Sequence, residues 1–386
     1  MQLLVLRSTD PDETRVAATP DSVGVLTGLG IDVSIEAGAG DRASHADAAY
    51  AQAGATIVAA DATLDEVDVA LTVTAPSATR LAQLPASCVL IGLLRPVHDL
   101  ATPRQLAEQG VSALAMELIP RISRAQPMDA LSSQAGIAGY RAVLVAANSL
   151  DKMFPLSMTA AGTIRPATVI VLGAGVAGLQ AIATARRLGA NVLANDVRAA
   201  AADEVASLGA DFIHIPGVTE QTGDGGYAEV LGADLAAAQH AALRPHLAKA
   251  NAVICTAQIP GRRAPVLLPA ELVEEMPAGT IVIDLPAEDG GNCALTQLGS
   301  EVEHHGVRII PAPQLARSMP HEASALYARN VANLVRLLVQ DGQLHLDLDD
   351  DILAGALYVH DGEVVHRPTR DALSSALTSD HGSEGA

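Results

Sequence analysis

The stretch Val169–Arg198 reads VIVLGAGVAGLQAIATARRLGANVLANDVR, and it decides the fold. Its β-branched run, Val169–Val171, predicts a strand that ends at the glycine-rich turn Gly173–Gly178, and an alanine-rich helical pattern follows at once. In a G-x-G-x-x-G turn, the first two glycines let the backbone turn sharply and approach a pyrophosphate, and the third lets the helix pack closely on the strand. The pyrophosphate would sit at the helix N-terminus. The stretch therefore predicts the strand, turn and helix of a dinucleotide-binding unit.

An acidic residue follows the next predicted strand. That strand, Asn191–Ala194, is followed by Asp196, which lies 18 residues beyond Gly178. A carboxylate there can accept hydrogen bonds from both ribose hydroxyls and would repel a 2′-phosphate, so the position favours NAD(H) over NADP(H). Two alternatives stay open: folds that bind FAD or S-adenosylmethionine use similar turns, and Asp196 could instead be a helix N-cap or a surface partner of Arg198.

The composition excludes several classes of function. The formal net charge of −20 opposes binding to nucleic acid or to an anionic lipid surface. The three cysteines, Cys88, Cys255 and Cys293, have no metal-ligand spacing, so we expect no metal and a reduced, cytoplasmic compartment. No apolar run is long enough to span a membrane, and Met1–Arg7 reads as a first strand rather than a signal peptide.

The region before residue 130 alternates short apolar runs with helical patterns, which indicates a parallel sheet covered by helices. The predicted strands are Gln2–Leu6, Asp32–Ile35, Asp68–Val73, Cys88–Leu93 and Ala113–Glu117. The predicted helices between them are Pro20–Leu29, Ser44–Ala53 and Pro103–Gln109. This region has no glycine fingerprint of its own.

The remaining chain predicts a second, doubly wound unit. A helix over Ser132–Lys152 is long enough to bridge two domains, and a connector over Pro155–Pro166 precedes the nucleotide strand. Further strands are predicted at Asp211–Ile215, Ala252–Thr256, Thr280–Asp284 and Val307–Pro311. A helix over Glu322–Val339 leads back to the first domain, and a hairpin over Ile352–Val365 turns at Asp361-Gly362.

We therefore predict an α/β chain with two Rossmann-like domains, whose parallel sheets are flanked by helices and joined by long helices. The N-terminal domain is discontinuous and comprises residues 1–132 and 322–373. The nucleotide-binding domain with its linking helix comprises residues 133–321, and residues 374–386 form a disordered tail. The glycine-rich segment Gly217–Gly232 is predicted to be either a functional, mobile loop or a solvated insertion.

Several motifs resemble the NAD(H)-binding component, domain I, of proton-translocating nicotinamide nucleotide transhydrogenase, a family akin to alanine dehydrogenase. The resemblance runs from the RVAATP stretch near residue 15 to about residue 370. It is carried by PRISRAQPMDALSSQ, GYRAVLVAA, MTAAGTI, GAGVAGLQAIATARRLGA, NDVRA, GGYA, IPGRRAPVL and IVIDLPAEDGGNC.

The resemblance implies roles for individual residues. Gln126 and Asp129 would hold the carboxamide and ring of the nicotinamide, Arg121 and Ser132 would orient their loop, and Tyr227 would belong to a mobile loop that folds over the nucleotide. The implied cofactor-binding set is Gln126, Pro127, Met128, Asp129, Ser132, Gly173, Ala174, Gly175, Val176, Gly178, Asp196, Val197, Arg198, Gly226, Gln239, Ala257 and Gln258. Read without the family, the four polar residues from Arg121 to Ser132 form a helix N-terminus with Asp129 or Ser132 as its cap.

The resemblance also implies an activity and partners. NADH bound to this chain would deliver hydride directly to NADP⁺ on an NADP(H)-binding partner subunit, and membrane-spanning subunits would couple the reaction to proton translocation. The chain would be a separately encoded subunit and a homodimer, held on the cytoplasmic face of the membrane through its partners. The sequence departs from the family at Gln258, at Pro286 and at Gln314–Ser318.

Two rival functions are weighed against this one. An alanine dehydrogenase of the related family needs an arginine near residue 15, a lysine in a KVKEP-like stretch and a histidine at the end of the next strand. Arg15 is present, but Thr72 and Thr74 stand where the lysines fall, and His98 is displaced past Pro96. The second rival is a non-catalytic NAD-binding sensor or scaffold, which need not hold the nicotinamide in a reactive pose.

Overall fold

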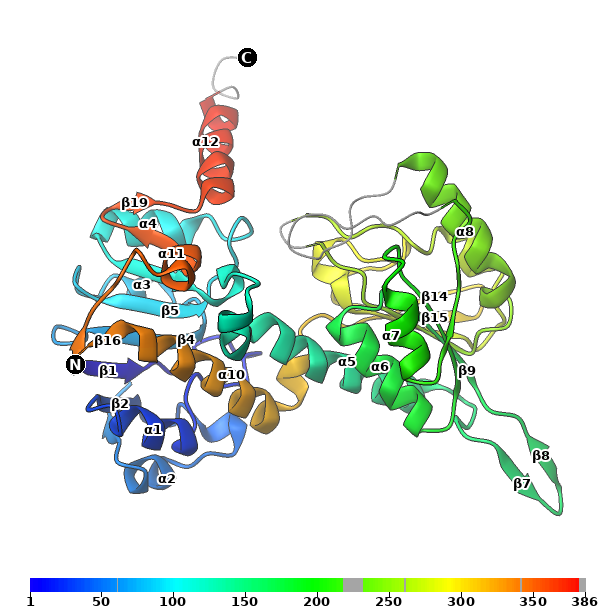
Figure 1. Cartoon of the computed structure of the whole chain (residues 1–386), viewed down its shortest axis with the longest axis horizontal. Coiled ribbons are helices and arrows are strands. Elements are labelled where there is room, and N and C mark those ends of the chain that lie inside the picture. Colours follow the sequence, from blue (N-terminus) through cyan, green and yellow to red (C-terminus); the bar gives the residue numbers. More distant parts are fainter. Residues whose placement is uncertain (61, 218–231, 260–261, 341, 382–386) are drawn as a thin grey trace. The chain divides into compact units, whose positions relative to one another are not determined.

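The computed structural model describes residues 1–386 except 61, 218–231, 260–261, 341 and 382–386. The chain divides into two compact units (Figure 1). Unit 1 comprises Met1–Gln134 with Met319–Ala386, and unit 2 comprises Ala135–Ser318. Helix α5 (Ala130–Ser149) crosses from the first unit into the second.

Unit 1 is built on one sheet whose strand order is β19-β18-β6-β5-β4-β1-β2-β3 among the described residues. Strands β1 to β6 run parallel, and β18 and β19 form an antiparallel edge. The strands are β1 (Gln2–Val5), β2 (Asp32–Glu36), β3 (Thr56–Val58), β4 (Val69–Thr74), β5 (Val89–Leu93), β6 (Ser112–Ala115), β18 (Leu357–His360) and β19 (Glu363–Val364). Alternate side chains on each strand are buried on opposite faces: Leu3, Val5 and Leu71 on one, and Leu4, Ala70 and Leu90 on the other.

The helices of unit 1 cover both faces of this sheet. They are α1 (Pro20–Thr27), α2 (Asp47–Gln52), α3 (Ala78–Leu81), α4 (Ala101–Gln109), the start of α5, α10 (Pro320–Val335), α11 (Asp351–Ala356) and α12 (Arg367–His381), with short 3₁₀ helices η1 (Asp41–Ala43), η2 (Met116–Leu118), η3 (Ser123–Met128) and η7 (Arg336–Leu338). A small antiparallel pair, β16 (Val339–Gln340) and β17 (Gln343–Leu344), follows η7.

Unit 2 is a doubly wound sheet with the strand order β11-β10-β9-β12-β13-β15-β14. Its strands are β9 (Thr168–Leu172), β10 (Asn191–Asn195), β11 (Asp211–Phe212), β12 (Ala252–Cys255), β13 (Ile281–Asp284), β15 (Val307–Pro311) and the antiparallel edge strand β14 (Val302–His304). Its helices are the rest of α5, α6 (Val176–Arg187), α7 (Ala201–Ser207), α8 (Ala233–Leu247), α9 (Ala270–Glu274), η5 (Leu285–Asp289) and η6 (Leu315–Ser318). Val169–Leu172 are completely buried, as expected for a strand covered on both faces.

The predicted α/β fold with helix-flanked, mainly parallel sheets is confirmed, and the chain order of the strands agrees with it. Several local details differ from the prediction. The sheets are not purely parallel, because β14, β18 and β19 run antiparallel at their edges. Strand β3 was missed, because three residues leave too short a pattern to identify.

The hairpin prediction at Ile352–Val365 is correct only in its second half. The turn lies at Asp361 and Gly362, which have φ values of 48° and 77°, as a two-residue hairpin turn requires. Ile352–Ala356 instead belong to helix α11, because the Asp350 side chain accepts hydrogen bonds from the Ile352 and Leu353 amides and caps that helix.

Two segments predicted to lack regular structure have it. The connector at Pro155–Pro166 contains an antiparallel hairpin of β7 (Ser157–Thr159) and β8 (Gly162–Ile164), which projects from the body of unit 2 (Figure 1). The tail predicted from residue 374 continues helix α12 to His381, where the Ser374 and Ser375 hydroxyls donate to carbonyls one turn earlier.

The three cysteines are all reduced and completely buried. Cys88 lies in unit 1, and Cys255 and Cys293 lie in unit 2. Burial raises the pKa of the Cys88 thiol to about 12 and that of the Cys293 thiol to about 11. No helix in the described part of the chain combines the length and apolar character that a membrane span needs.

Candidate functional site

The glycine turn joins β9 to α6 at the centre of the unit 2 sheet. Gly173 has a φ of 96°, which favours glycine, and its amide donates to the Asn195 carbonyl at 2.8 Å. A Cβ on Gly178 would lie 1.9 Å from the Gly173 carbonyl oxygen, so only glycine lets the first turn of α6 approach the end of β9. The third glycine therefore has the packing role that the sequence predicted.

The middle glycine stands at an open position. Gly175 is the N-cap of α6 and provides no side-chain hydrogen bond to it. A Cβ built there has no neighbour within 4 Å, and the next residue, Val176, is 48% exposed. The amides at the start of α6 can therefore receive a phosphate, whose charge the helix dipole would stabilise.

Asp196 lies beside this turn and is held in one orientation. Its carboxylate accepts hydrogen bonds from the Ala174 amide at 2.7 Å and the Arg198 amide at 2.9 Å. The Arg198 guanidinium also donates to it at 3.1 Å. The alternative interpretation, a pairing with Arg198, is thus also observed. It coexists with the other, because the contact with Ala174 fixes the carboxylate at the edge of the glycine turn.

Three further residues in the predicted cofactor set have different surroundings. Ala257 follows β12, and its amide lies 2.9 Å from a Cβ built on Gly173. Gln258 is exposed and donates to Asp289 at 2.5 Å. Gln239 is buried, and its amide donates to Asn195 at 2.8 Å, so its observed contact holds α8 against the end of β10. Gly226 and Tyr227 lie outside the described residues.

The predicted nicotinamide residues are grouped at the start of α5 in unit 1. Asp129 caps this helix, because its carboxylate accepts from the Ser132 amide at 2.8 Å and from the Ser132 hydroxyl at 2.5 Å. The interpretation of these residues as a helix N-terminus with Asp129 as its cap is therefore confirmed. Arg121 and Gln126 are exposed.

The segment that carries Gln126 is anchored on helix α10. The Pro127 carbonyl accepts hydrogen bonds from Asn330 at 2.8 Å and Asn333 at 3.1 Å, and Met128 is buried beneath it. The backbone around Gln126 is thus fixed, whereas the Gln126 side chain faces solvent. Such an arrangement can present an amide to a ligand with little loss of backbone entropy.

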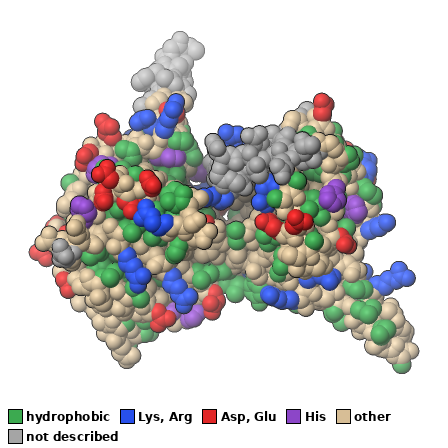
Figure 2. All heavy atoms as spheres, viewed as in Figure 1, with side chains coloured by type: hydrophobic (Ala, Val, Ile, Leu, Met, Phe, Trp, Pro, Cys, Tyr) green, Lys and Arg blue, Asp and Glu red, His purple; other side chains and the backbone are tan. Residues whose placement is uncertain are grey.

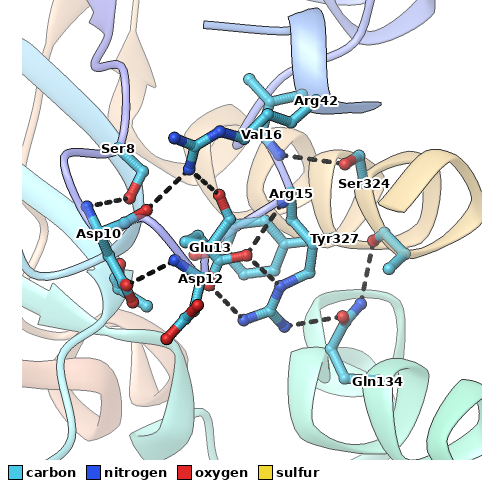
Figure 3. A network of polar contacts seen from close by, with 12 residues as sticks. Ser8, Asp10, Asp12, Glu13, Arg15, Val16, Arg42, Gln134, Ser324 and Tyr327 are labelled. Carbon is cyan, nitrogen blue, oxygen red and sulfur yellow. Dashed lines mark hydrogen bonds and ion pairs between the residues drawn. The ribbon is translucent and has the colours of Figure 1, made fainter. Parts of the chain in front are cut away.

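Arg15 lies in a buried polar network at the carboxyl end of the unit 1 sheet (Figure 3). Its guanidinium donates to both oxygens of Glu13 at 2.8 Å and to Gln134 at 2.9 Å. Gln134 in turn donates to the Ala323 carbonyl at 3.0 Å. Arg15 and Glu13 are 4% and 1% exposed. Arg15 is therefore a structural cation here, and a ligand carboxylate would have to compete with Glu13 and Gln134.

The strands that would carry the other alanine dehydrogenase residues end in backbone-supporting contacts. The Thr72 hydroxyl donates to the Thr74 carbonyl, and the Tyr327 hydroxyl donates to the Thr72 carbonyl at 2.8 Å. After β5, the Leu94 and Arg95 amides both donate to Glu117. Burial raises the pKa of the Glu117 carboxyl to about 7. The described residues at these strand ends supply neither the lysine nor the histidine of the rival reaction.

One group of side chains in the described residues could share a metal ion. Glu274, His304 and His305 bring one donor atom each within 4.8 Å of one another. His304 ends the antiparallel strand β14, beside the residue that begins β15, so the group lies at the amino ends of the parallel strands. It is therefore at the opposite edge of the sheet from the glycine turn and is not part of the candidate coenzyme site.

Sequence reasoning missed three residues that support the site: Glu13, Asp284 and Asn292. Each is completely or almost completely buried and bonded to a neighbouring loop. A signal was present for two of them, since Asp284 ends a predicted strand and a Gly-Gly-Asn turn follows it. Glu13 had only its spacing of two residues from Arg15.

Comparisons with known proteins cover both units. The family "Alanine dehydrogenase/PNT, N-terminal domain" matches residues 4–138, and "Alanine dehydrogenase/PNT, C-terminal domain" matches residues 142–367. The chain is 42% identical to the first of the separate parts of the NAD(P) transhydrogenase alpha subunit of Rhodospirillum rubrum, over 95% of this chain and 98% of that protein.

Two solved structures have the same fold over nearly the whole chain. A transhydrogenase from Sinorhizobium meliloti superposes with a TM-score of 0.83 at 40% identity, covering 95% of this chain and 100% of that one. An L-alanine dehydrogenase superposes with a TM-score of 0.79 at 26% identity, covering 97% and 99%. The fold is thus shared by two chemistries, and individual residues must separate them.

Proposed function

The chain belongs to the alanine dehydrogenase/PNT family, and on that premise we propose that it is the NAD(H)-binding subunit of a transhydrogenase. One observation carries the choice: similarity at 42% identity to a transhydrogenase subunit extends over 98% of that subunit. The site supports it, because the Gly173–Gly178 turn and the oriented Asp196 carboxylate suit a dinucleotide without a 2′-phosphate.

The proposed mechanism is direct hydride transfer to NADP⁺ held by a partner subunit, in which bound NADH supplies the hydride from its nicotinamide C4. No proton moves to or from this chain, so its residues act by positioning. Asp196 and the start of α6 hold the adenosine and pyrophosphate. Gln126 offers an exposed amide to the carboxamide, and Asp129 and Ser132 fix the backbone on which Gln126 stands.

Replacing Gln126 by alanine is expected to slow hydride transfer about tenfold or more while NADH affinity changes little, because a mispositioned nicotinamide still binds. Asp196→Ala should instead raise the NADH dissociation constant about tenfold, since it removes hydrogen bonds to ribose. Stopped-flow transfer from NADH to an NADP analogue, with a transhydrogenase NADP-binding domain added, measures the first quantity, and fluorescence titration measures the second.

The matched control is Gln52→Ala, which removes another exposed glutamine of unit 1. Equal losses of affinity and transfer rate in Gln126→Ala would contradict the positioning role. A chain that binds NADH but transfers no hydride even with the partner domain present would favour a non-catalytic sensor. Reductive amination of pyruvate with NADH and ammonia by the isolated chain would instead identify an alanine dehydrogenase.

The proposed assembly includes membrane-spanning and NADP(H)-binding partner subunits, which would couple hydride transfer to proton translocation and hold this chain on the cytoplasmic face of the membrane. The Rhodospirillum rubrum relative is named as one portion of an alpha subunit, which supports partners of this kind. On the visible face in Figure 2, acidic and basic side chains are interspersed, which suits protein partners better than nucleic acid.

We also propose that the chain is a homodimer that buries the projecting β7–β8 hairpin against a second copy. Met158, at 73% exposed, lies on the hairpin with Ile164 at 45%, and Leu156 at 52% precedes it. Figure 2 shows hydrophobic side chains on this projection. A lone two-stranded hairpin is marginally stable in water, and its exposed apolar surface fits association with another protein surface.

The Met158→Asp variant is expected to sediment as a monomer, whereas wild-type protein sediments as a dimer at micromolar concentration. The control is Leu298→Asp, which alters an apolar side chain of unit 2 that is 61% exposed but lies away from the hairpin in sequence. A wild-type monomer, or a Met158→Asp dimer of unchanged affinity, would remove the proposal.

A further inference from the structure

A buried carboxylate organises the loop that follows β13. Asp284, the last residue of that strand, is 0% exposed. It accepts hydrogen bonds from the Asn292 amide at 3.0 Å, the Cys293 amide at 3.1 Å and the Thr296 hydroxyl at 2.5 Å. Gly291 allows this approach, because its φ is 75° and a Cβ there would lie 2.5 Å from the Asp284 carboxylate. The backbone at Asn292 is therefore fixed from one side by Asp284.

Asn292 connects this loop to the loop that follows β12. Its side-chain oxygen accepts from the Ala257 amide at 3.0 Å. Its side-chain nitrogen donates to the Ala257 and Pro265 carbonyls, both at 2.8 Å. The Asn292 carbonyl also accepts from the Leu267 and Leu268 amides. Asn292 is 0% exposed, so it satisfies backbone groups that water does not reach.

The other side of Ala257 abuts the glycine turn. The Thr256 hydroxyl donates to the Gly173 carbonyl at 2.9 Å, and a Cβ on Gly173 would lie 2.9 Å from the Ala257 amide nitrogen. Strand β9 lies between β10 and β12, which makes the carboxyl end of this pair the switch point of the sheet, where ligands bind. The position of Ala257 therefore sets one wall of the coenzyme crevice.

We propose that Asn292, oriented by Asp284, is a positioning residue that fixes the Ala257 backbone beside the glycine turn and thereby sets the affinity for the dinucleotide. The identity of that ligand as NADH rests on the proposed function. Asn292 does not touch the reacting atoms. Its removal frees the Ala257 amide and carbonyl, and the wall of the crevice can then move away from the turn.

A purely structural role would have a different signature, and Thr280 provides the comparison. Thr280 is 1% exposed and donates from its hydroxyl to the Ala250 and Pro277 carbonyls at 3.0 and 2.7 Å. It directly precedes β13, so it lies at the amino end of the strand that Asp284 ends. Thr280→Val thus removes buried side-chain hydrogen bonds from the same strand, at the edge away from the coenzyme.

The experiment compares full-length wild-type protein with Asn292→Ala, Asn292→Ser and Thr280→Val. NADH affinity is measured by fluorescence titration, stability by thermal unfolding, and hydride transfer at saturating NADH with an NADP-binding domain added. We expect Asn292→Ala to weaken NADH binding about tenfold or more with transfer at saturation nearly retained, and serine to give a smaller loss. Thr280→Val should lower the unfolding temperature without changing the NADH affinity.

The inference is overturned if the Asn292 variant binds NADH within twofold of wild type while losing as much thermal stability as Thr280→Val. If Asn292→Ala does not fold, the same comparison is made with Asn292→Ser, which keeps one hydroxyl for hydrogen bonding. Wild-type protein that fails to bind NADH would overturn the proposed function instead, and that result is distinguishable because it precedes any comparison of variants.

Discussion

Replacing Gly178 by alanine is expected to lower the affinity for NADH by more than about 100-fold. The added Cβ would lie 1.9 Å from the Gly173 carbonyl oxygen and 3.0 Å from the Thr256 hydroxyl oxygen. The first of these atoms belongs to the backbone and cannot rotate away, so α6 must separate from the glycine turn. Overpacking of this kind also destabilises a protein by roughly 1–3 kcal/mol or more. Fluorescence titration and urea unfolding measure the two losses.

The matched control for this prediction is Gly175→Ala. A methyl group there meets no atom within 4 Å, and the φ of −75° suits alanine, so the free energy of unfolding should change little. Its affinity for NADH should nevertheless fall, because the methyl group stands where a pyrophosphate would approach. NADH affinity equal to wild type in both variants would show that the turn does not bind the coenzyme.

Replacing Glu13 by glutamine is expected to lower the free energy of unfolding by about 3–5 kcal/mol, because it leaves the Arg15 charge buried without a counter-charge. The two side chains pair through both carboxylate oxygens at 2.8 Å, and Glu13 also accepts from the Arg15 amide at 3.0 Å. Glutamine keeps the shape but offers one acceptor oxygen in place of two. Urea unfolding at neutral pH measures the loss.

An exposed ion pair of unit 1 is the comparison for Glu13. Arg367 and Asp371 lie 3.7 Å apart at side-chain exposures of 83% and 67%. Asp371→Asn should cost no more than about 0.5 kcal/mol, because water screens such a pair. A cost for Glu13→Gln as small as that of Asp371→Asn would mean that the buried network does not depend on the charge.

The glycine turn and the central strands were predictable because their signals are local. A β-branched run followed by glycines at fixed spacing describes β9 and α6 completely. Helix α11 had a local signal too, since Asp350 precedes Ile352, but the following apolar run fits a strand as well as a short helix. Strand β3 pairs with β2 over only three residues, so its identity depends on its partner rather than on its own pattern.

The candidate site was predictable where one residue acts from one loop. Asp196 was located by its distance from the glycines, and Asp129 was identified as a possible cap by its residue type. Asn292 bonds to Ala257, which is 35 positions away, and Gln134 bonds to Arg15, which is 119 positions away. Such contacts arise from the order of strands in the sheet, and a single sequence does not reveal which buried polar groups meet.

The buried thiols give each unit an intrinsic reporter of its own opening. A disulfide reagent reacts with thiolate, which is scarce and inaccessible while Cys88 in unit 1 and Cys293 in unit 2 remain packed. Labelling rates at individual cysteines, resolved by mass spectrometry of peptides, would therefore follow local unfolding of the two units separately in one native chain. Coenzyme that stabilises unit 2 would slow modification of Cys255 and Cys293, and any slowing at Cys88 would measure how far that stabilisation extends into unit 1.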